Sequence, residues 1–345
     1  MRRTRFAIAR DPGRFKEGPL AKSTPLLLLA ALMLGGWFFF RNYEIEGLDQ
    51  LKVVPRRASA SAASGRLGRG RAAGGTIRIA TFNIQVFGVE KLDQPAVMDI
   101  IVRAIRQFDV VAIQEVRSTH QDVIPRLVTL LNAGGRQYSY VLGPRLGRTR
   151  SKEQYAFVFD EVTLEVDRAK GYTIEDPDDV LHRPPLVACF RARGPPPDQA
   201  FTFTLVNVHT DPDEVDDEMN RMDDVLFSVR SDGRGEDDVI LLGDFNADDH
   251  HLGELGRVAG MTAEISGTDT NTRRTRQYDN LFFQLPATSE YTGHSGVFDF
   301  LREYNLTLEQ ALQVSDHLPV WAEFSRVESG SPTAVAVVPP ADTTR

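Results

Sequence analysis

Residues Val239–Asp248 read VILLGDFNAD, and residues Val314–Val320 read VSDHLPV. The first stretch begins with four apolar residues, typical of a buried strand, and then brings an Asp, an Asn and a second Asp into a loop. The second places an adjacent Asp-His pair directly before another apolar strand. Taken alone, either stretch could be a strand followed by a polar turn. Together they indicate the carboxylates and imidazole with which a hydrolase holds a divalent cation and activates water.

Other strands that the sequence predicts also end in polar side chains. Apolar patterns predict strands at 77–83, 110–113, 155–159, 186–190, 201–208, 239–242, 278–283 and 318–324. Helical spacing predicts helices at 94–107, 121–132, 214–229 and near 308–312. The polar residues at strand ends are Asn83, Glu115, His209, Asp244 and Asp316. A mixed-sheet architecture with outer helices and one shared active edge explains this placement. A repeating βαβ layout does not, because no glycine-rich turn follows the first strand.

With these motifs in order, the chain resembles the exonuclease–endonuclease–phosphatase superfamily, and more closely the deoxyribonuclease I family. The resemblance runs from about Ile77 to Phe324 and depends on several motifs together, because each alone is weak. The motifs are TFNI (81–84), QEVR (114–117), KEQY (152–155), VH (208–209), GDFNAD (243–248), YD (278–279), FDF (298–300) and SDH (315–317). The resemblance implies a four-layer α/β sandwich, in which two packed mixed β-sheets are flanked by helices.

The family's metal and phosphate residues carry over onto matching positions. The resemblance implies a Mg²⁺ (or Mn²⁺) site held mainly by Glu115, with Asn83 and Asp316 nearby. It implies that Asp244 and Asn246 orient the scissile phosphate and its water, or help to bind a second cation. Mg²⁺ prefers oxygen ligands and keeps several waters, which suits a site with few carboxylates that substrate phosphate completes.

Two histidine–carboxylate pairs are implied as the proton-transfer groups: His317 with Asp279, and His209 with Glu153. A neutral imidazole can take a proton from water, and a carboxylate on its other nitrogen fixes the tautomer and stabilises the imidazolium. The opposite imidazole must start protonated to donate to the leaving oxygen, and a neighbouring carboxylate raises its pKa. We expect His317 to be the base and His209 the acid, and the reverse order stays open.

Other titratable residues are expected to have plainer roles. His250 and His251 fit a solvated loop better than a metal site, and His182 and His294 are taken as surface residues. The family's disulfide cysteines are absent, so loop stability could depend on a structural Ca²⁺. The candidates for such a site are Asp248, the loop 175–179 and Asp269, with a plain acidic turn as the alternative for each.

Basic residues bear on the substrate, because the superfamily also contains sphingomyelinases and inositol phosphatases. Arg117 and Arg183 match arginines with which the family contacts DNA, and His120 is a further candidate contact. Arg and Lys residues between 145 and 152 predict a basic loop beside the site, which could grip a polyanion backbone. A solvated loop of no consequence is the alternative.

Two departures weaken the match to a DNA-binding surface. Gln85 stands where the family has an arginine, and Ser151 where it has a tyrosine that reaches into the minor groove. We therefore expect a metal-dependent phosphodiester hydrolase, foremost a deoxyribonuclease I-like endonuclease that acts on DNA as a monomer, with no protein partner. The alternatives are a phosphodiesterase for phospholipids or other phosphate esters (sphingomyelinase-like), and a non-catalytic binding module.

The N-terminal part of the chain has a different character. The first 75 residues hold 14 Lys and Arg against five Asp and Glu, about +9, which leaves the remainder near −17 of a total of −8. Residues 26–40 form a run of fifteen without a charge, ending in aromatic residues, with a basic flank and no small-x-small cleavage site. This pattern favours an uncleaved signal anchor with the catalytic domain outside the cytoplasm. A cleaved signal peptide with secretion, or a buried soluble helix, is the alternative.

The expected organisation has five parts. These are a basic cytoplasmic N-terminus (1–24), a membrane anchor or signal segment (25–40), a flexible linker (41–75), an endonuclease/exonuclease/phosphatase domain (76–326) and a disordered tail (327–345).

Overall fold

The computed structural model describes residues 75–148 and 152–329. The strands of one sheet, in spatial order, are β11 (Tyr291–Val297), β12 (Val320–Ser325), β1 (Thr76–Phe87), β2 (Val110–Val116), β4 (Gln154–Asp160) and β3 (Tyr138–Leu142). Those of the other are β5 (Leu164–Thr173), β6 (Leu186–Ala192), β7 (Thr202–His209), β8 (Val239–Asp244), β10 (Asp279–Gln284) and β9 (Met261–Ala263). The helical segments are α2 (Val89–Leu92), α3 (Pro95–Ile105), α4 (Val123–Asn132), α5 (Val215–Met219), α6 (Met222–Arg230), η4 (Leu255–Arg257), α7 (Phe300–Glu303) and α8 (Leu308–Val314).

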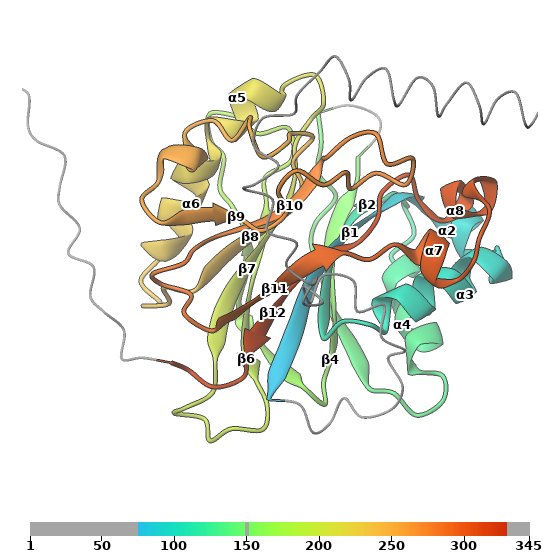
Figure 1. Ribbon diagram of the computed structural model, residues 1–345, viewed down its shortest axis with the longest axis horizontal. Helices are drawn as coiled ribbons and strands as arrows, with labels where there is room; N and C mark the ends of the chain where they lie inside the picture. The colour runs from blue at the N-terminus through green and yellow to red at the C-terminus, as the bar shows by residue number, and fades with distance from the viewer. Residues whose placement is uncertain (1–74, 149–151, 330–345) are drawn as a thin grey trace, which may run out of the picture. The chain divides into compact units, whose positions relative to one another are not determined.

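These elements form four layers (Figure 1). Helices α2, α3, α4, α7 and α8 cover the outer face of the first sheet, and α5 and α6 cover the outer face of the second. Aromatic residues fill the space between the sheets: Phe157 in β4 meets Phe190 in β6 edge to face, with ring centroids 5.7 Å apart. Both sheets contain parallel and antiparallel pairs. The predicted four-layer α/β sandwich of two packed mixed sheets is therefore confirmed.

Burial explains which segments the sequence predicts well. Every residue of β8 is buried, so its apolar run is continuous, as expected for a central strand covered on both faces. Helix α3 buries Val97, Ile101 and Ala104 at helical spacing against the first sheet. Strand β5, by contrast, has a mostly exposed middle, and β11 is only half-buried, so neither shows a strong apolar pattern and neither was predicted. Strands β3 and β9 and helices α2 and α7 were also missed, and the predicted helix 214–229 is broken into α5 and α6.

The two parallel strand pairs position the functional residues. Strand β1 runs parallel to β2, with Asn83 opposite Gln114, and β7 runs parallel to β8, with His209 opposite Asp244. Parallel strands end at the same edge of a sheet, so the polar residues that follow each apolar run come together. Asn83 Nδ2 donates a hydrogen bond to Asp244 Oδ2 at 2.9 Å, which joins the two sheets at this edge.

The chain stays ordered slightly beyond the predicted end of the domain. Val327 pairs with Ala200 in an isolated bridge, and the Glu328 N–H donates to the Gln199 carbonyl at 2.9 Å. The predicted anchor at 25–40, the segments on either side of it and the tail from residue 330 lie outside the described residues. In the part that is described, no helix is both long enough and apolar enough to cross a membrane.

Candidate active site

Two backbone features shape the edge where the sheets meet. A Cβ at Gly243 would lie 1.8 Å from the Val208 carbonyl oxygen, so glycine is required for β8 to approach β7 this closely just before Asp244. Glu115 has a φ of +60°, uncommon for a residue with a side chain, at a point where the pairing of β2 and β4 shifts register. The Glu115 carboxylate accepts a hydrogen bond from Asn83 Nδ2 at 3.3 Å. Backbone strain of this kind is typical of functional sites.

The first imidazole–carboxylate pair links the two sheets. His209 ends β7, Glu153 directly precedes β4, and His209 Nδ1 lies 2.6 Å from Glu153 Oε1. Both side chains are buried. The Tyr155 hydroxyl accepts a hydrogen bond from the His209 N–H at 2.9 Å, and Arg183 Nε donates to the His209 carbonyl at 3.1 Å. The backbone and the ring of His209 are thus both held in place.

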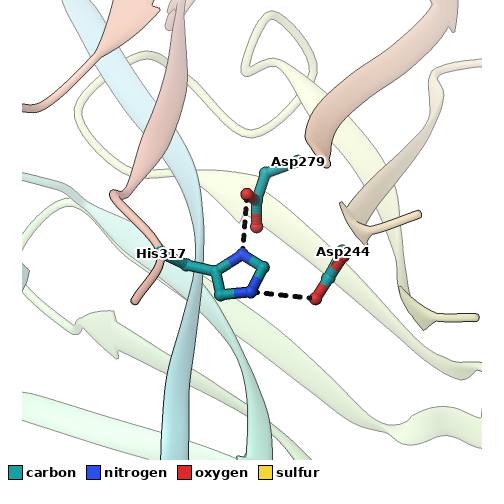
Figure 2. Close-up of side chains that lie close together, drawn as sticks. All are labelled: Asp244, Asp279 and His317. Atoms are coloured by element: carbon teal, nitrogen blue, oxygen red, sulfur yellow. Dashed lines mark hydrogen bonds and ion pairs between the residues drawn. The ribbon is translucent and has the colours of Figure 1, made fainter. Parts of the chain in front are cut away.

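The second pair is drawn in Figure 2, where the His317 imidazole lies between two carboxylates. His317 Nδ1 is 2.9 Å from Asp279 Oδ2, and the Thr270 hydroxyl donates to the same oxygen at 2.7 Å. The His317 N–H donates to Ser315 Oγ at 3.0 Å, which fixes the backbone. The sequence prediction that pairs His317 with Asp279 and His209 with Glu153 agrees with these distances, whereas the catalytic roles stay predictions.

Asp244 lies between the two imidazoles. Its Oδ2 atom is 3.6 Å from His209 Nε2 and 3.5 Å from His317 Nε2. Its Oδ1 atom accepts a hydrogen bond from the Asn246 N–H at 3.0 Å, and Asn246 Nδ2 donates to the Thr210 carbonyl at 2.9 Å. Each Nδ1 atom already faces a carboxylate, and both Nε2 atoms face Asp244 Oδ2. A reactant bound beside this carboxylate could exchange protons with both rings.

In the His209–Glu153 pair, neighbouring charges shift both pKa values further than burial shifts them in the opposite direction. Burial opposes ionisation of Glu153, but the charges of His209, Arg183 and Arg117 lower the pKa of this carboxyl below its usual value. Burial by itself would lower the pKa of His209, but Glu153 and Asp244 raise it above its usual value. The pair therefore favours an imidazolium beside a carboxylate.

In the second pair, neighbouring charges again outweigh burial in setting the pKa of the imidazole. Burial opposes protonation of His317, but Asp279 and Asp244 raise its pKa to about 10. Burial raises the pKa of Asp279 against the charge of His317. Burial also opposes ionisation of Asp244, but His317 and His209 lower its pKa. Both imidazoles thus favour the protonated form, so these charges do not by themselves separate a base from an acid.

Oxygen atoms beside Asp244 suit a hard divalent cation. Asn83 is fully buried, and its Oδ1 atom has no hydrogen-bond partner, which is costly unless a ligand satisfies it. The side-chain amide of Asn83 also contacts the Glu115 carboxylate. At the same edge, the Asp316 side chain is 45% exposed. Asp244, Asp279 and His317 also lie close enough to hold an ion, but the Asp279 oxygen there already faces the imidazole. The carbonyl and carboxylate oxygens of Asn83 and Glu115 are better suited to hold a hard divalent cation.

The substrate contacts predicted from the sequence divide into two groups. Arg117 is 29% exposed, lies 3.1 Å from Glu115 Oε2, and can reach a ligand at the mouth of the site. His120 is exposed in the loop after β2. Arg183, however, is 6% exposed and donates to the carbonyls of His209 and Thr210, which favours a buried, positioning role, and its contact with substrate stays a prediction. Its guanidinium is occupied by protein acceptors.

The folded structure also shows where four other residues discussed in the sequence analysis lie. His182 is buried rather than on the surface, with Nδ1 3.3 Å from Asp211 Oδ2. Arg148, from the expected basic loop, forms ion pairs with Asp179 and Glu214, so much of its charge is neutralised. His294, also expected on the surface, is exposed there, with 56% of its side chain accessible. The former Ca²⁺ candidate Asp248 pairs with the exposed His251 ring at 2.6 Å.

Residues that sequence reasoning missed support the site from behind. The Lys91 amine donates to the carbonyls of Val314 (2.8 Å) and Gln85, and burial lowers its pKa to about 8 against the charges of Glu115 and Asp316. Lys91 and Thr270 belong to no motif, and although Tyr155 ends the KEQY motif, the partner of its hydroxyl cannot be read from the sequence. A pocket of about 490 Å³ opens beside the site, lined by Asn246, Tyr278, His250, His251, Thr268 and Arg276.

Comparisons with known proteins agree with this geometry. Residues 80–317 match the Endonuclease/Exonuclease/phosphatase family. Deoxyribonuclease gamma of Mus musculus is 33% identical over 261 residues, which cover 71% of this chain and 83% of that protein. Deoxyribonuclease-1-like 1 of Sus scrofa is 35% identical over 261 residues, which cover 72% of this chain and 81% of that protein. A solved structure of humanized D. rerio TDP2 covers 73% of this chain and 100% of its own, with a TM-score of 0.50 and 16% identity, and so shows the fold alone. The chain therefore belongs to the endonuclease/exonuclease/phosphatase family.

Proposed function

We propose that this protein is a Mg²⁺-dependent endonuclease that hydrolyses phosphodiester bonds of DNA. The observation that carries the proposal is the convergence of two buried imidazole–carboxylate pairs on Asp244, with His209 Nε2 at 3.6 Å and His317 Nε2 at 3.5 Å. Two imidazoles on opposite sides of one point can activate a water and protonate a leaving oxygen in the same reaction. The relatives named deoxyribonucleases favour DNA as the substrate.

The chain's own groups divide the work of proton transfer. Asp279 and Glu153 hold the two Nδ1 atoms, which leaves each Nε2 atom for the reacting oxygens. In this proposal His317 takes a proton from the attacking water and His209 gives one to the leaving oxygen. Asn246 positions the phosphate through its side-chain amide. We propose that the enzyme works as a monomer, with all of these residues supplied by one chain.

A divalent cation has a defined place in this scheme. Asn83 and Glu115 would hold it, with Asp316 at the same edge. When bound, the cation supplies positive charge that stabilises the negative charge on the phosphoryl oxygens. Positive charge near Asp244 weakens the attraction of this carboxylate for the proton on His317. The pKa of His317 should therefore fall when the ion is bound, as a general base requires.

The surroundings of the site offer contacts for a nucleotide, and the adjoining pocket is lined by Asp216, Asp248, Asp249 and Asp269 as well as by Arg276. The pocket of about 490 Å³ has the size of ordinary small-ligand sites and begins at Asn246, next to the reacting point. The Tyr278 ring, which contacts His317 at a centroid distance of 5.6 Å, lines the same pocket and offers an apolar face for a sugar or base. Arg117 stands across the site with part of its guanidinium exposed, where it can meet a phosphate.

The test uses supercoiled plasmid, single-stranded RNA, and sphingomyelin and phosphoinositide vesicles, each with Mg²⁺ and with excess EDTA. We expect plasmid nicking that leaves 5′-phosphate ends, requires the cation, and is lost in His317→Gln. The matched control is His294→Gln, which changes an exposed histidine of β11 outside the site and should cleave normally.

Three results would contradict the proposal. Unchanged cleavage in EDTA would exclude the metal requirement. Rapid hydrolysis of a lipid with no cleavage of nucleic acid would make the protein a phospholipid phosphodiesterase. Tight DNA binding by the unaltered chain with no turnover of any substrate would make it a non-catalytic binding module.

The cellular location belongs to the same proposal and is supported by sequence only. The apolar run at 26–40 with its basic flank should keep the chain on a membrane, with the catalytic domain outside the cytoplasm. A reporter enzyme fused after Arg345 should be active only outside the cytoplasm, whereas activity restricted to the cytoplasm would rule out this orientation. Recovery of soluble protein that begins after residue 40 would indicate a cleaved signal peptide instead.

A further inference from the structure

Three carboxylates meet at the opposite end of the second sheet from the active site. Asp238 directly precedes β8, Glu290 directly precedes β11, and Glu328 follows β12. One oxygen of each lies within 4.8 Å of the others. Asp238 and Glu290 are 1% and 2% exposed, and Glu328 is half-buried. Segments far apart in the sequence thus place like charges together inside the protein, which is costly unless something neutralises them.

No basic side chain provides that neutralisation. Within residues 75–148 and 152–329, none of these three carboxylates forms an ion pair with lysine, arginine or histidine. Glu236 brings a further carboxylate, since its Oε1 atom accepts a hydrogen bond from the Asp238 N–H at 3.0 Å. The cluster is therefore strongly negative, and its charge is not explained by the fold alone.

Buried polar atoms around the cluster also lack partners. Asp238 Oδ1 and Glu290 Oε2 are buried without a hydrogen bond. The hydroxyl of Thr288, a residue only 1% exposed, lies beside Asp238 and has no hydrogen-bond partner of good geometry. This neutral oxygen adjoins the Asp238 carboxyl, whose pKa it lowers, and together with the two unpartnered carboxylate oxygens it points to a ligand that takes oxygen donors from several directions.

We propose that Asp238, Glu290 and Glu328, with the Thr288 hydroxyl, form a structural Ca²⁺ site. Ca²⁺ binds six to eight oxygens at about 2.3–2.6 Å, so oxygens on opposite sides of the ion lie roughly 4.6–5.2 Å apart. The separations here, no more than 4.8 Å, fit that span. Mg²⁺ needs near-ideal octahedral geometry and shorter distances, and it keeps its waters, so a buried cage of carboxylates suits it less well.

Shared protons are the competing explanation for the cluster. Burial, with the charges of Glu290 and Glu236, raises the pKa of Asp238 to about 9, and burial with Glu290 raises the pKa of Glu328 to about 7. Protons could therefore neutralise part of the charge at neutral pH when no cation is present. They would not satisfy the Thr288 oxygen and the remaining carboxylate oxygens together, whereas a cation bound among them would. The two explanations predict different responses to Ca²⁺.

The site would act on stability rather than on chemistry. It would tie the segment after β12 to the start of β8 and to the turn before β11, and so close the end of the domain. This inference depends on the fold and on these contacts, not on the proposed activity. It concerns residues outside the Asp248, 175–179 and Asp269 loops that the sequence suggested for Ca²⁺.

The experiment measures thermal unfolding of the full-length chain, first stripped of metal and then given Ca²⁺, Mg²⁺ or EGTA. Ca²⁺ at about 100 times its Kd should raise the Tm by roughly 5–10 °C. Glu290→Gln should lose most of this rise, while its metal-free Tm stays equal to or above that of the unaltered chain, because one like charge is gone. Glu309→Gln, which changes an exposed residue of α8 that belongs to neither site, is the matched control and should keep the rise.

Equilibrium dialysis with Ca²⁺ measures directly how many ions each chain binds. We expect one site fewer in Glu290→Gln than in Glu309→Gln or the unaltered chain. If Glu290→Gln does not fold, Glu328→Gln takes its place, because Glu328 is half-buried and its loss is milder. The proposal is overturned if the unaltered chain gains no stability from Ca²⁺, or if the glutamine variants of the cluster keep the full gain. A rise obtained equally with Mg²⁺ and Ca²⁺ would also overturn the assignment to Ca²⁺.

Discussion

Replacing Arg183 with methionine should destabilise the domain strongly, rather than simply weaken substrate binding. Arg183 is 6% exposed, donates to the carbonyls of His209 (3.1 Å) and Thr210 (2.9 Å), and lies 3.4 Å from Glu153. Methionine has a similar length but no charge and no donor. The change therefore leaves the 1% exposed Glu153 carboxylate with less compensation and removes donors from two backbone carbonyls.

The expected size of the effect follows from these contacts. Removing one partner of a buried charge pair typically costs about 3–5 kcal/mol, a large share of a total stability of roughly 5–15 kcal/mol. In a domain of this size each kcal/mol moves the Tm by about 2–4 °C, so the Tm should fall by roughly 6–20 °C. Arg117→Met is the comparison: its side chain is 29% exposed, and we expect a loss of about 1 kcal/mol or less, with weaker DNA binding that depends less steeply on salt because one phosphate contact is gone.

Urea unfolding followed by circular dichroism measures the free energy of unfolding, and fluorescence anisotropy with a labelled duplex measures Kd. Both are compared for Arg183→Met, Arg117→Met and the unaltered chain, with and without Mg²⁺. The reasoning is refuted if Arg183→Met unfolds at the same urea concentration as the unaltered chain and only its Kd rises. Arg183 would then be the substrate contact that the sequence alone suggests.

Three further outcomes are expected. His209→Ala and His317→Ala should each lower turnover by at least about 100-fold with little change in Kd for DNA, as measured by plasmid nicking; near-normal rates would show that the catalytic assignment is wrong. In EDTA, the stability that the His317 imidazolium contributes should be fully present below pH 6.5 and should be lost as the pH rises through about 10, because its pKa is raised in the folded state. Urea unfolding of the unaltered chain and His317→Gln across this range checks the sign, and a constant difference between them contradicts it. Tyr155→Phe should cost about 1–3 kcal/mol, because the buried His209 N–H loses its acceptor, and an unchanged urea midpoint would argue against that contact.

Local sequence pattern was sufficient for the central strands and for the polar residues at their ends that became the candidate site residues. Strand β8 is buried throughout, so its apolar run and the Asp and Asn that follow it are visible in the sequence. The order of the short motifs then led to the family resemblance, and through it to the four-layer fold and the pairing of each histidine with its carboxylate. These features depend on residue type at fixed places along the chain, which a sequence displays directly.

Only the tertiary structure could decide contacts between segments distant in the sequence. Arg183 looks like a substrate contact in the sequence, but the fold places its guanidinium among the carbonyls behind His209. Lys91 and Thr270 belong to no motif and Tyr155 ends the KEQY motif, yet the contacts by which they hold the site cannot be read from the sequence, because their partners come from other strands and loops. The same holds for Asp238, Glu290 and Glu328, three unremarkable acidic residues until the folding of both sheets brings them within 4.8 Å. Burial, partner and local charge depend on the whole chain, and those quantities set what each side chain does.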